Sequence, residues 1–156
     1  MGCDIHWLVE GQRKDTLAWE QPAFDKLIQY EGNDDAEIES QFDVRNHDRN
    51  YALFFLLAGV RYWRDELGPD PMPLFPSRGL PADSTRKPDD DTVPWLGDHS
   101  HTWFDKDDWN SVSRENKDLL KKIAPEVVHA LDGLLFYDRF KSSLYKRYRV
   151  LVGFDS

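Results

Sequence analysis

The segment from Tyr51 to Val60 limits the possible folds most, because its ten residues carry no charged side chain. Asn50 is a favourable N-cap before this segment, and Gly68-Pro69 ends the helical pattern after it. A helix that is apolar on all sides must lie inside the protein. The sequence therefore predicts a buried helix over about residues 50–67.

Both ends of the chain have the alternating pattern of strands. Residues 3–10 predict a first strand with Asp4 and His6 on one face. Residues 148–154 place apolar side chains on one side of a last strand, which we expect to pair beside the first. Between these ends, we expect a turn at residues 11–15, a short helix at 22–30 and a turn at 32–35.

The second half of the chain predicts two more helices and a long loop. The aspartates within residues 105–108 suit a helix start, and Pro125 suits the first turn of a later helix. Seven of the nine prolines fall within residues 69–94, where regular structure is nearly excluded. We expect an ordered loop over 69–99 with apolar anchors, which are Leu74, Phe75, Leu80 and Trp95.

These elements predict one α+β domain over residues 1–156. Its small sheet includes both chain termini and is packed by the buried helix and the C-terminal helices. Apolar residues make up 40% of the chain, enough for a core without disulfides. The single cysteine, Cys3, excludes an internal disulfide and a multi-cysteine zinc site, and we expect it to be a small buried apolar residue.

The charge of the chain limits the kinds of molecule that it can bind. The net charge of −9 argues against a protein that coats duplex nucleic acid. Residues 139–156 hold five basic residues and one acidic residue, so this end could contact a small phosphorylated ligand. No run is long and apolar enough for a membrane span, and the start lacks a secretory signal. We expect a cytoplasmic protein, and the sequence leaves a homo-oligomer open.

Clusters of histidine and aspartate suggest a metal site. Asp4 and His6 are one residue apart on a strand, and His99 and His101 repeat this spacing if their segment is extended. These four residues are the predicted ligands of a divalent Mn, Fe, Zn or Ni ion. His99, His101 and Asp98 are the candidate catalytic residues. The alternatives are solvated surface groups at the first strand and turn or capping roles near residue 100.

Arginines suggest a phosphate site. Arg45 and Arg49 precede the buried helix, and Arg78 lies in a turn that could offer donors to an anion. Arg45 and Arg49 could instead pair with neighbouring aspartates. Trp103 could stack a base or anchor the loop. Ser100 lies between two histidines, but no G-x-S-x-G turn surrounds it, so the sequence does not predict a serine nucleophile.

The order D-x-H, G-N-D-D, N-H-D and H-S-H resembles a compressed calcineurin-like metallophosphoesterase pattern. In that family these motifs supply the metal ligands. The resemblance implies ligands at the matching positions, which are Asp4, His6, Asp34 or Asp35, Asn46, His99 and His101.

Four further stretches resemble a family of small proteins carried by bacteriophages and their hosts. They are MGCDIH, RNYALFFLLAGVR, RGLPADS and HSHTW, together 31 of 156 residues. This resemblance implies a viral accessory factor and assigns no catalytic residue.

Two functions follow from these patterns. The first is a metal-dependent hydrolase acting on a phosphodiester or nucleotide, with Arg45, Arg49, Arg78 and Trp103 binding the substrate. The second is a non-catalytic phage accessory protein that inhibits a host defence factor. It would bind a host protein through its acidic surface or sequester a nucleotide signal.

Overall fold

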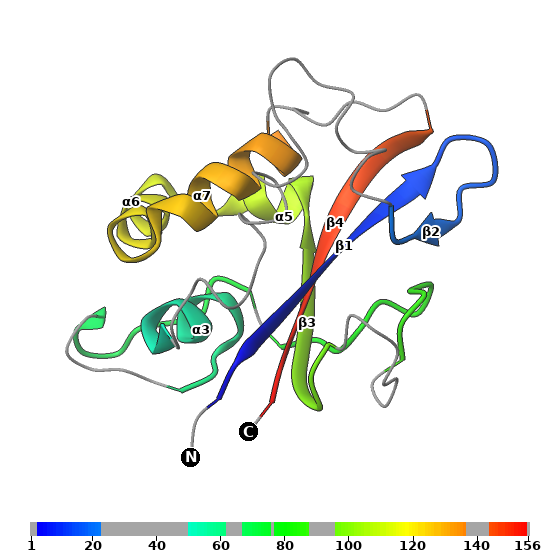
Figure 1. Cartoon of the computed structure of the whole chain (residues 1–156). Helices are drawn as coiled ribbons and strands as arrows, with labels where there is room; N and C mark the ends of the chain where they lie inside the picture. The colour runs from blue at the N-terminus through cyan, green and yellow to red at the C-terminus, as the bar shows by residue number, and fades with distance from the viewer. Residues whose placement is uncertain are drawn as a thin grey trace.

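The computed structural model describes residues 3–22, 50–61, 67–75, 77–87, 96–136 and 144–155. Their centre is a four-stranded antiparallel sheet in the order β2-β1-β4-β3 (Figure 1). The strands are β1 (Ile5–Arg13), β2 (Trp19–Glu20), β3 (His99–Asp105) and β4 (Tyr145–Phe154). The first and last of the described strands, β1 and β4, form the central pair, which confirms the predicted α+β fold.

Several predicted features lie outside the described residues. These are most of the helix expected at 22–30, the turn at 32–35, and the residues Arg45, Asn46, Arg49 and Trp95.

Strand β1 is longer than the sequence predicted. The turn expected at residues 11–15 was placed too early, because Gly11, Gln12 and Arg13 all pair with β4. The chain instead turns at residues 14–16 before β2. The pairing with β4 continues the strand past Gly11, a residue that would otherwise favour a turn.

The buried helix α3 spans Tyr51–Ala58. The Asn50 side chain caps it by accepting a hydrogen bond from the Leu53 N–H, and Leu53 is completely buried. The helix ends well before the predicted residue 67, because Gly59 adopts a left-handed conformation at φ 73° and its N–H donates to the Phe55 carbonyl. Burial was predicted correctly and helix length was not.

Three short helices follow β3 in the described residues 106–136. They are α5 (Lys106–Ser111), α6 (Arg114–Ile123) and α7 (Pro125–Leu131), and a π-helical turn at Asp132–Phe136 extends the last. Asp105 and Asp108 form a reciprocal capping box at the start of α5. Both predicted helix starts, the acidic one and the one at Pro125, are confirmed.

The two faces of the sheet are packed differently. The helix-side face carries the main core, where Phe54 of α3 meets Phe154 at 5.4 Å between ring centroids. Phe75 anchors the long loop to this core by stacking on Phe104 at 4.3 Å. The opposite face, which we call the loop-side face, carries a smaller apolar cluster of Leu8, Leu96 and Leu151.

None of the described helices has the length and apolar character required to cross a membrane.

Cys3 lies in the main core with 1% of its surface exposed. Burial raises the pKa of its thiol, although a hydrogen bond from Arg61 works in the opposite direction. We expect maleimide to alkylate Cys3 at pH 7.5 roughly a hundredfold more slowly in the folded protein than in urea, because the thiolate is the reactive form. Mass spectrometry over time would measure both rates, and equal rates would contradict the burial of Cys3.

Candidate functional site

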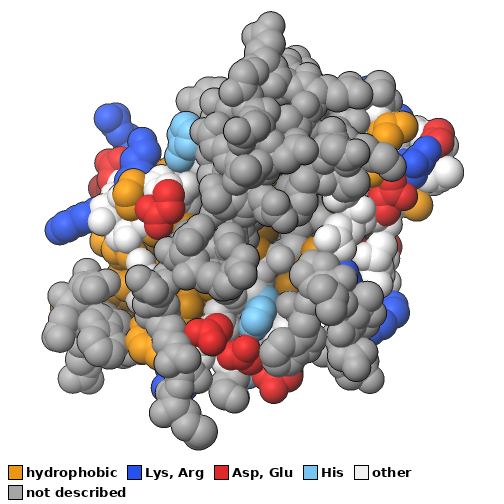
Figure 2. Space-filling model, in the orientation of Figure 1, with side chains coloured by type: hydrophobic (Ala, Val, Ile, Leu, Met, Phe, Trp, Pro, Cys, Tyr) orange, Lys and Arg blue, Asp and Glu red, His pale blue; other side chains and the backbone are white. Residues whose placement is uncertain are grey.

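The two chain ends meet at one end of the sheet and bring His6 to Asp155. The His6 Nε2 lies 2.8 Å from Asp155 Oδ2, and the two side chains are 22% and 25% exposed. Backbone contacts fix the pair, because the Asp4 N–H donates to Asp155 Oδ1 and the Asp155 N–H donates to the Asp4 carbonyl. Figure 2 shows acidic side chains around a histidine in the lower part of the molecule, where Figure 1 places both termini.

His101 lies on the same face as His6. His6 pairs directly with Gly153 of β4, so the missing Gly153 side chain would point to the His6 side of the sheet. On that side, His101 Cδ2 lies 2.7 Å from the position that a Cβ on Gly153 would take. His101 is 7% exposed, and its Nε2 is hydrogen-bonded to the Gly97 carbonyl at 3.0 Å. His6 and His101 therefore lie on the same face of the sheet, on the two strands that flank β4, and one His101 nitrogen already has a partner.

His99 points to the other face. Ser100 adopts φ 55° and forms a bulge, where the pairing of β3 with β4 shifts between His99 and Thr102. His99 pairs with Phe154 and its ring stacks on that ring at 6.3 Å. Neighbouring residues of β4 point to opposite faces. The spacing of His99 and His101 predicted that both lie on one face of the strand. The bulge at Ser100 instead places them on opposite faces.

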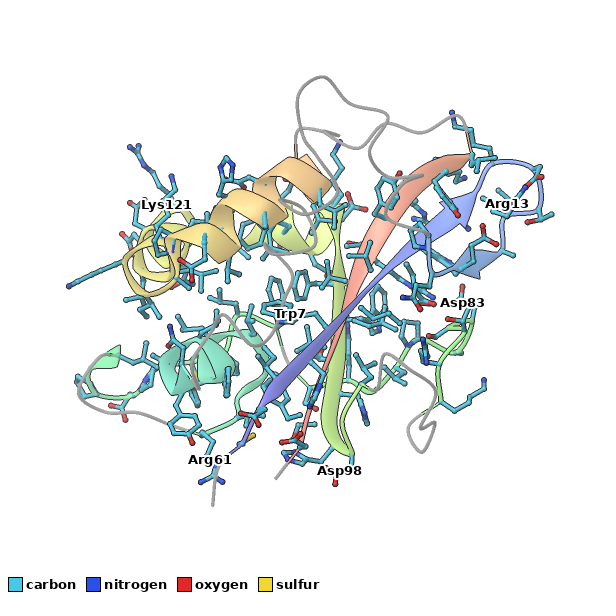
Figure 3. All side chains as sticks on the ribbon, in the orientation of Figure 1. Trp7, Arg13, Arg61, Asp83, Asp98 and Lys121 are labelled. Atoms are coloured by element: carbon cyan, nitrogen blue, oxygen red, sulfur yellow. The ribbon has the colours of Figure 1, made fainter. Side chains whose placement is uncertain are left out.

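Asp98 stands beside the end of β4 with an exposed side chain, as Figure 3 shows, and its N–H donates to the Phe154 carbonyl. One end of the sheet thus carries five of the predicted site residues, which are Asp4, His6, Asp98, His99 and His101. His99 lies on the face opposite to His6 and His101. Within the described part of the chain, however, no three His, Cys, Asp or Glu side chains are arranged to hold a metal ion.

Arg78 is engaged with the protein itself. Its guanidinium lies 3.7 Å from the centroid of the Trp103 ring, donates to the Trp103 carbonyl and pairs with Asp108 at 2.7 Å. The carbonyls of His101 and Trp103 on β3 are covered by residues 77–79 in this way. Arg78 and Trp103 were predicted to bind substrate, and in the structure they hold each other at the edge of the sheet.

Within the described part of the basic C-terminal end, Arg149 is already paired inside the protein. Arg149 is 3% exposed and pairs with the fully buried Glu10 at 2.9 Å and with Asp83 at 2.9 Å. Its guanidinium also lies 3.8 Å from the centroid of the Trp19 ring. Partial burial raises the pKa of Asp83, but the hydrogen bond and charge of Arg149 outweigh this effect and lower it. One of the basic residues expected to meet a ligand is therefore neutralised inside the protein.

Sequence reasoning missed Asp155 as a partner of His6. The available signal was the expected pairing of residues 3–10 with 148–154. An antiparallel register that aligns His6 with Gly153 also brings Asp155, two residues further along, to the same face. The sequence does not give the register of this strand pairing, because an alternation with a period of two residues fits several registers.

No family model matches the chain, and neither does any curated protein or solved structure.

Proposed function

We propose that the chain is a hydrolase of phosphodiester or nucleotide substrates, with His6 at the centre of its active site. The observation that carries the proposal is the His6–Asp155 pair, 2.8 Å apart and about one quarter exposed. A carboxylate that holds one nitrogen of an imidazole fixes the ring for acid–base work. The same arrangement orients histidines that bind metal ions.

A divalent cation, Mn, Fe, Zn or Ni, belongs to this proposal. Asp4 and Asp155 carry negative charge next to His6, and their backbones are joined by hydrogen bonds. Cations that assist phosphoryl chemistry are commonly held by one or two carboxylates, with substrate phosphate completing the ligand shell. Such a site requires no complete ligand set from the protein before the substrate binds.

The expected result is hydrolysis of bis(4-nitrophenyl) phosphate or a nucleotide that requires added Mn²⁺ or Zn²⁺ and stops with EDTA. We expect His6→Ala to lower the rate by about 10²-fold or more, the usual contribution of an acid–base group. Asp155→Asn should lower it by about 10-fold to 100-fold, as loss of a carboxylate behind a metal-binding histidine does.

His129→Ala is the matched control, because His129 is an exposed histidine on helix α7. It should retain the wild-type rate. Equal rates in His6→Ala and His129→Ala would contradict the proposal, as would the same rate with and without EDTA.

The second candidate is a non-catalytic phage accessory protein, acting in the host cytoplasm on a host protein or a nucleotide signal. It is supported by the engagement of Arg78 with Trp103 and Asp108, because an arginine predicted to bind substrate is already paired within the protein. Calorimetry with the nucleotides tested as substrates separates the two functions. Binding without turnover would favour this candidate.

A further inference from the structure

We propose that Ser100 is a nucleophile that His99 activates. Carboxylic or phosphoric esters would then acylate or phosphorylate the Ser100 hydroxyl. The Ser100 Oγ lies 2.9 Å from His99 Nδ1. This distance is within the range found between a nucleophile and its general base. The site is separate from the His6 pair, and the inference does not depend on the proposed function.

The backbone at Ser100 provides the second observation. Ser100 has φ 55°, in the left-handed region that serine rarely adopts. Residues held in this region outside glycine are enriched at functional sites, where the strain aims a side chain. Here the bulge places the hydroxyl beside His99 and leaves both side chains partly exposed.

The base is itself held in place. The His99 ring stacks on Phe154, with 6.3 Å between the centroids and 27° between the planes. Phe154 is completely buried and belongs to the main core. The nucleophile therefore lies beside a base whose ring is oriented by packing against a buried core residue.

The chemistry can be followed with a fluorophosphonate. The Ser100 Oγ attacks phosphorus, an O–P bond forms, the P–F bond breaks and fluoride leaves, while the hydroxyl proton moves to His99 Nδ1. A natural carboxylic or phosphoric ester would react in the same way, with an alcohol as the leaving group. The fluorophosphonate adduct is stable enough to locate by peptide mapping.

The experiment treats the full chain with a fluorophosphonate and follows the adduct by mass spectrometry. We expect one adduct, on Ser100. Ser100→Ala and Ser100→Gly should give no adduct, and Ser100→Gly should be at least as heat-stable as wild type because glycine accepts φ 55°. His99→Phe keeps an aromatic ring against Phe154 and should slow labelling by about 10²-fold; His99→Gln should do the same.

Ser111→Ala is the matched control, because Ser111 is exposed and its hydroxyl donates to the Asp108 carbonyl. It should label as fast as wild type. The proposal is wrong if wild-type Ser100 forms no adduct, or if both folded His99 variants label at the wild-type rate. An adduct on Ser111 in place of Ser100 would also overturn it.

Discussion

Gly153→Ala should destabilise the protein by about 3 kcal/mol, the upper range for forcing an extra carbon into a packed site. A Cβ at this position would collide with the Leu96 carbonyl oxygen and would lie 2.7 Å from His101 Cδ2. The Leu96 carbonyl is backbone, so it cannot rotate away as a side chain can. For a chain of this length, the expected fall in melting temperature is about 6–12 °C, measured by calorimetry or circular dichroism.

Gly79→Ala provides the matched control for this prediction. Gly79 has φ 74°, but a Cβ there would have no atom within 4 Å. Its cost is therefore limited to the left-handed backbone, about 1–2 kcal/mol. If Gly153→Ala proved no more harmful than Gly79→Ala, the close packing of residue 96 over β4 would be refuted.

Glu10→Ala should cost about 3–5 kcal/mol, because it leaves the buried Arg149 without its main partner. The Glu10 carboxylate is completely buried and accepts hydrogen bonds from Arg149 Nε at 3.0 Å, Ser84 Oγ at 3.2 Å and both the N–H and the hydroxyl of Thr85 at 3.1 and 3.0 Å. One side chain thus joins β1 to β4 and to the loop. Chemical denaturation would measure the loss.

Two further variants test the reason for that loss. Asp83→Asn removes the other partner of Arg149, but the Asp83 side chain is 65% exposed, so we expect a cost below about 1 kcal/mol. Replacing Glu10 and Arg149 together by Leu and Met removes both charges and should restore much of the stability. If the double variant were as unstable as Glu10→Ala, the unpaired buried charge of Arg149 would not be the cause of the lost stability.

The sequence predicted the elements of this fold better than their contacts. The alternation in residues 3–10 and 148–154 marks two strands with one apolar face each, and the burial of α3 follows from its uncharged surface. The end of α3 at Gly59 was missed because an isolated glycine within an apolar run is compatible with both a helix interior and a C-cap.

The candidate site was predictable only in part. Asp4, His6 and His101 do reach one end of the sheet, because the first strand and the segment after Gly97 both flank β4. His99 and His101 lie on opposite faces because of the backbone angle φ at Ser100. The spacing of residues in the sequence does not reveal that angle. The burial of Arg149 depends on Glu10, far away in the sequence, so a count of local charge could not detect it.

The pairing of β1 with β4 has a consequence for the order in which the chain folds. His6 lies opposite Gly153, so the central strand pair closes a loop that contains nearly the whole chain. Contacts between such distant residues form slowly, because the entropy of loop closure opposes them. During synthesis, residues 5–13 must wait for residues 145–154 to leave the ribosome before the sheet can form. Until then, the apolar side chains of β1 and α3 depend on partial packing or on chaperones to avoid aggregation.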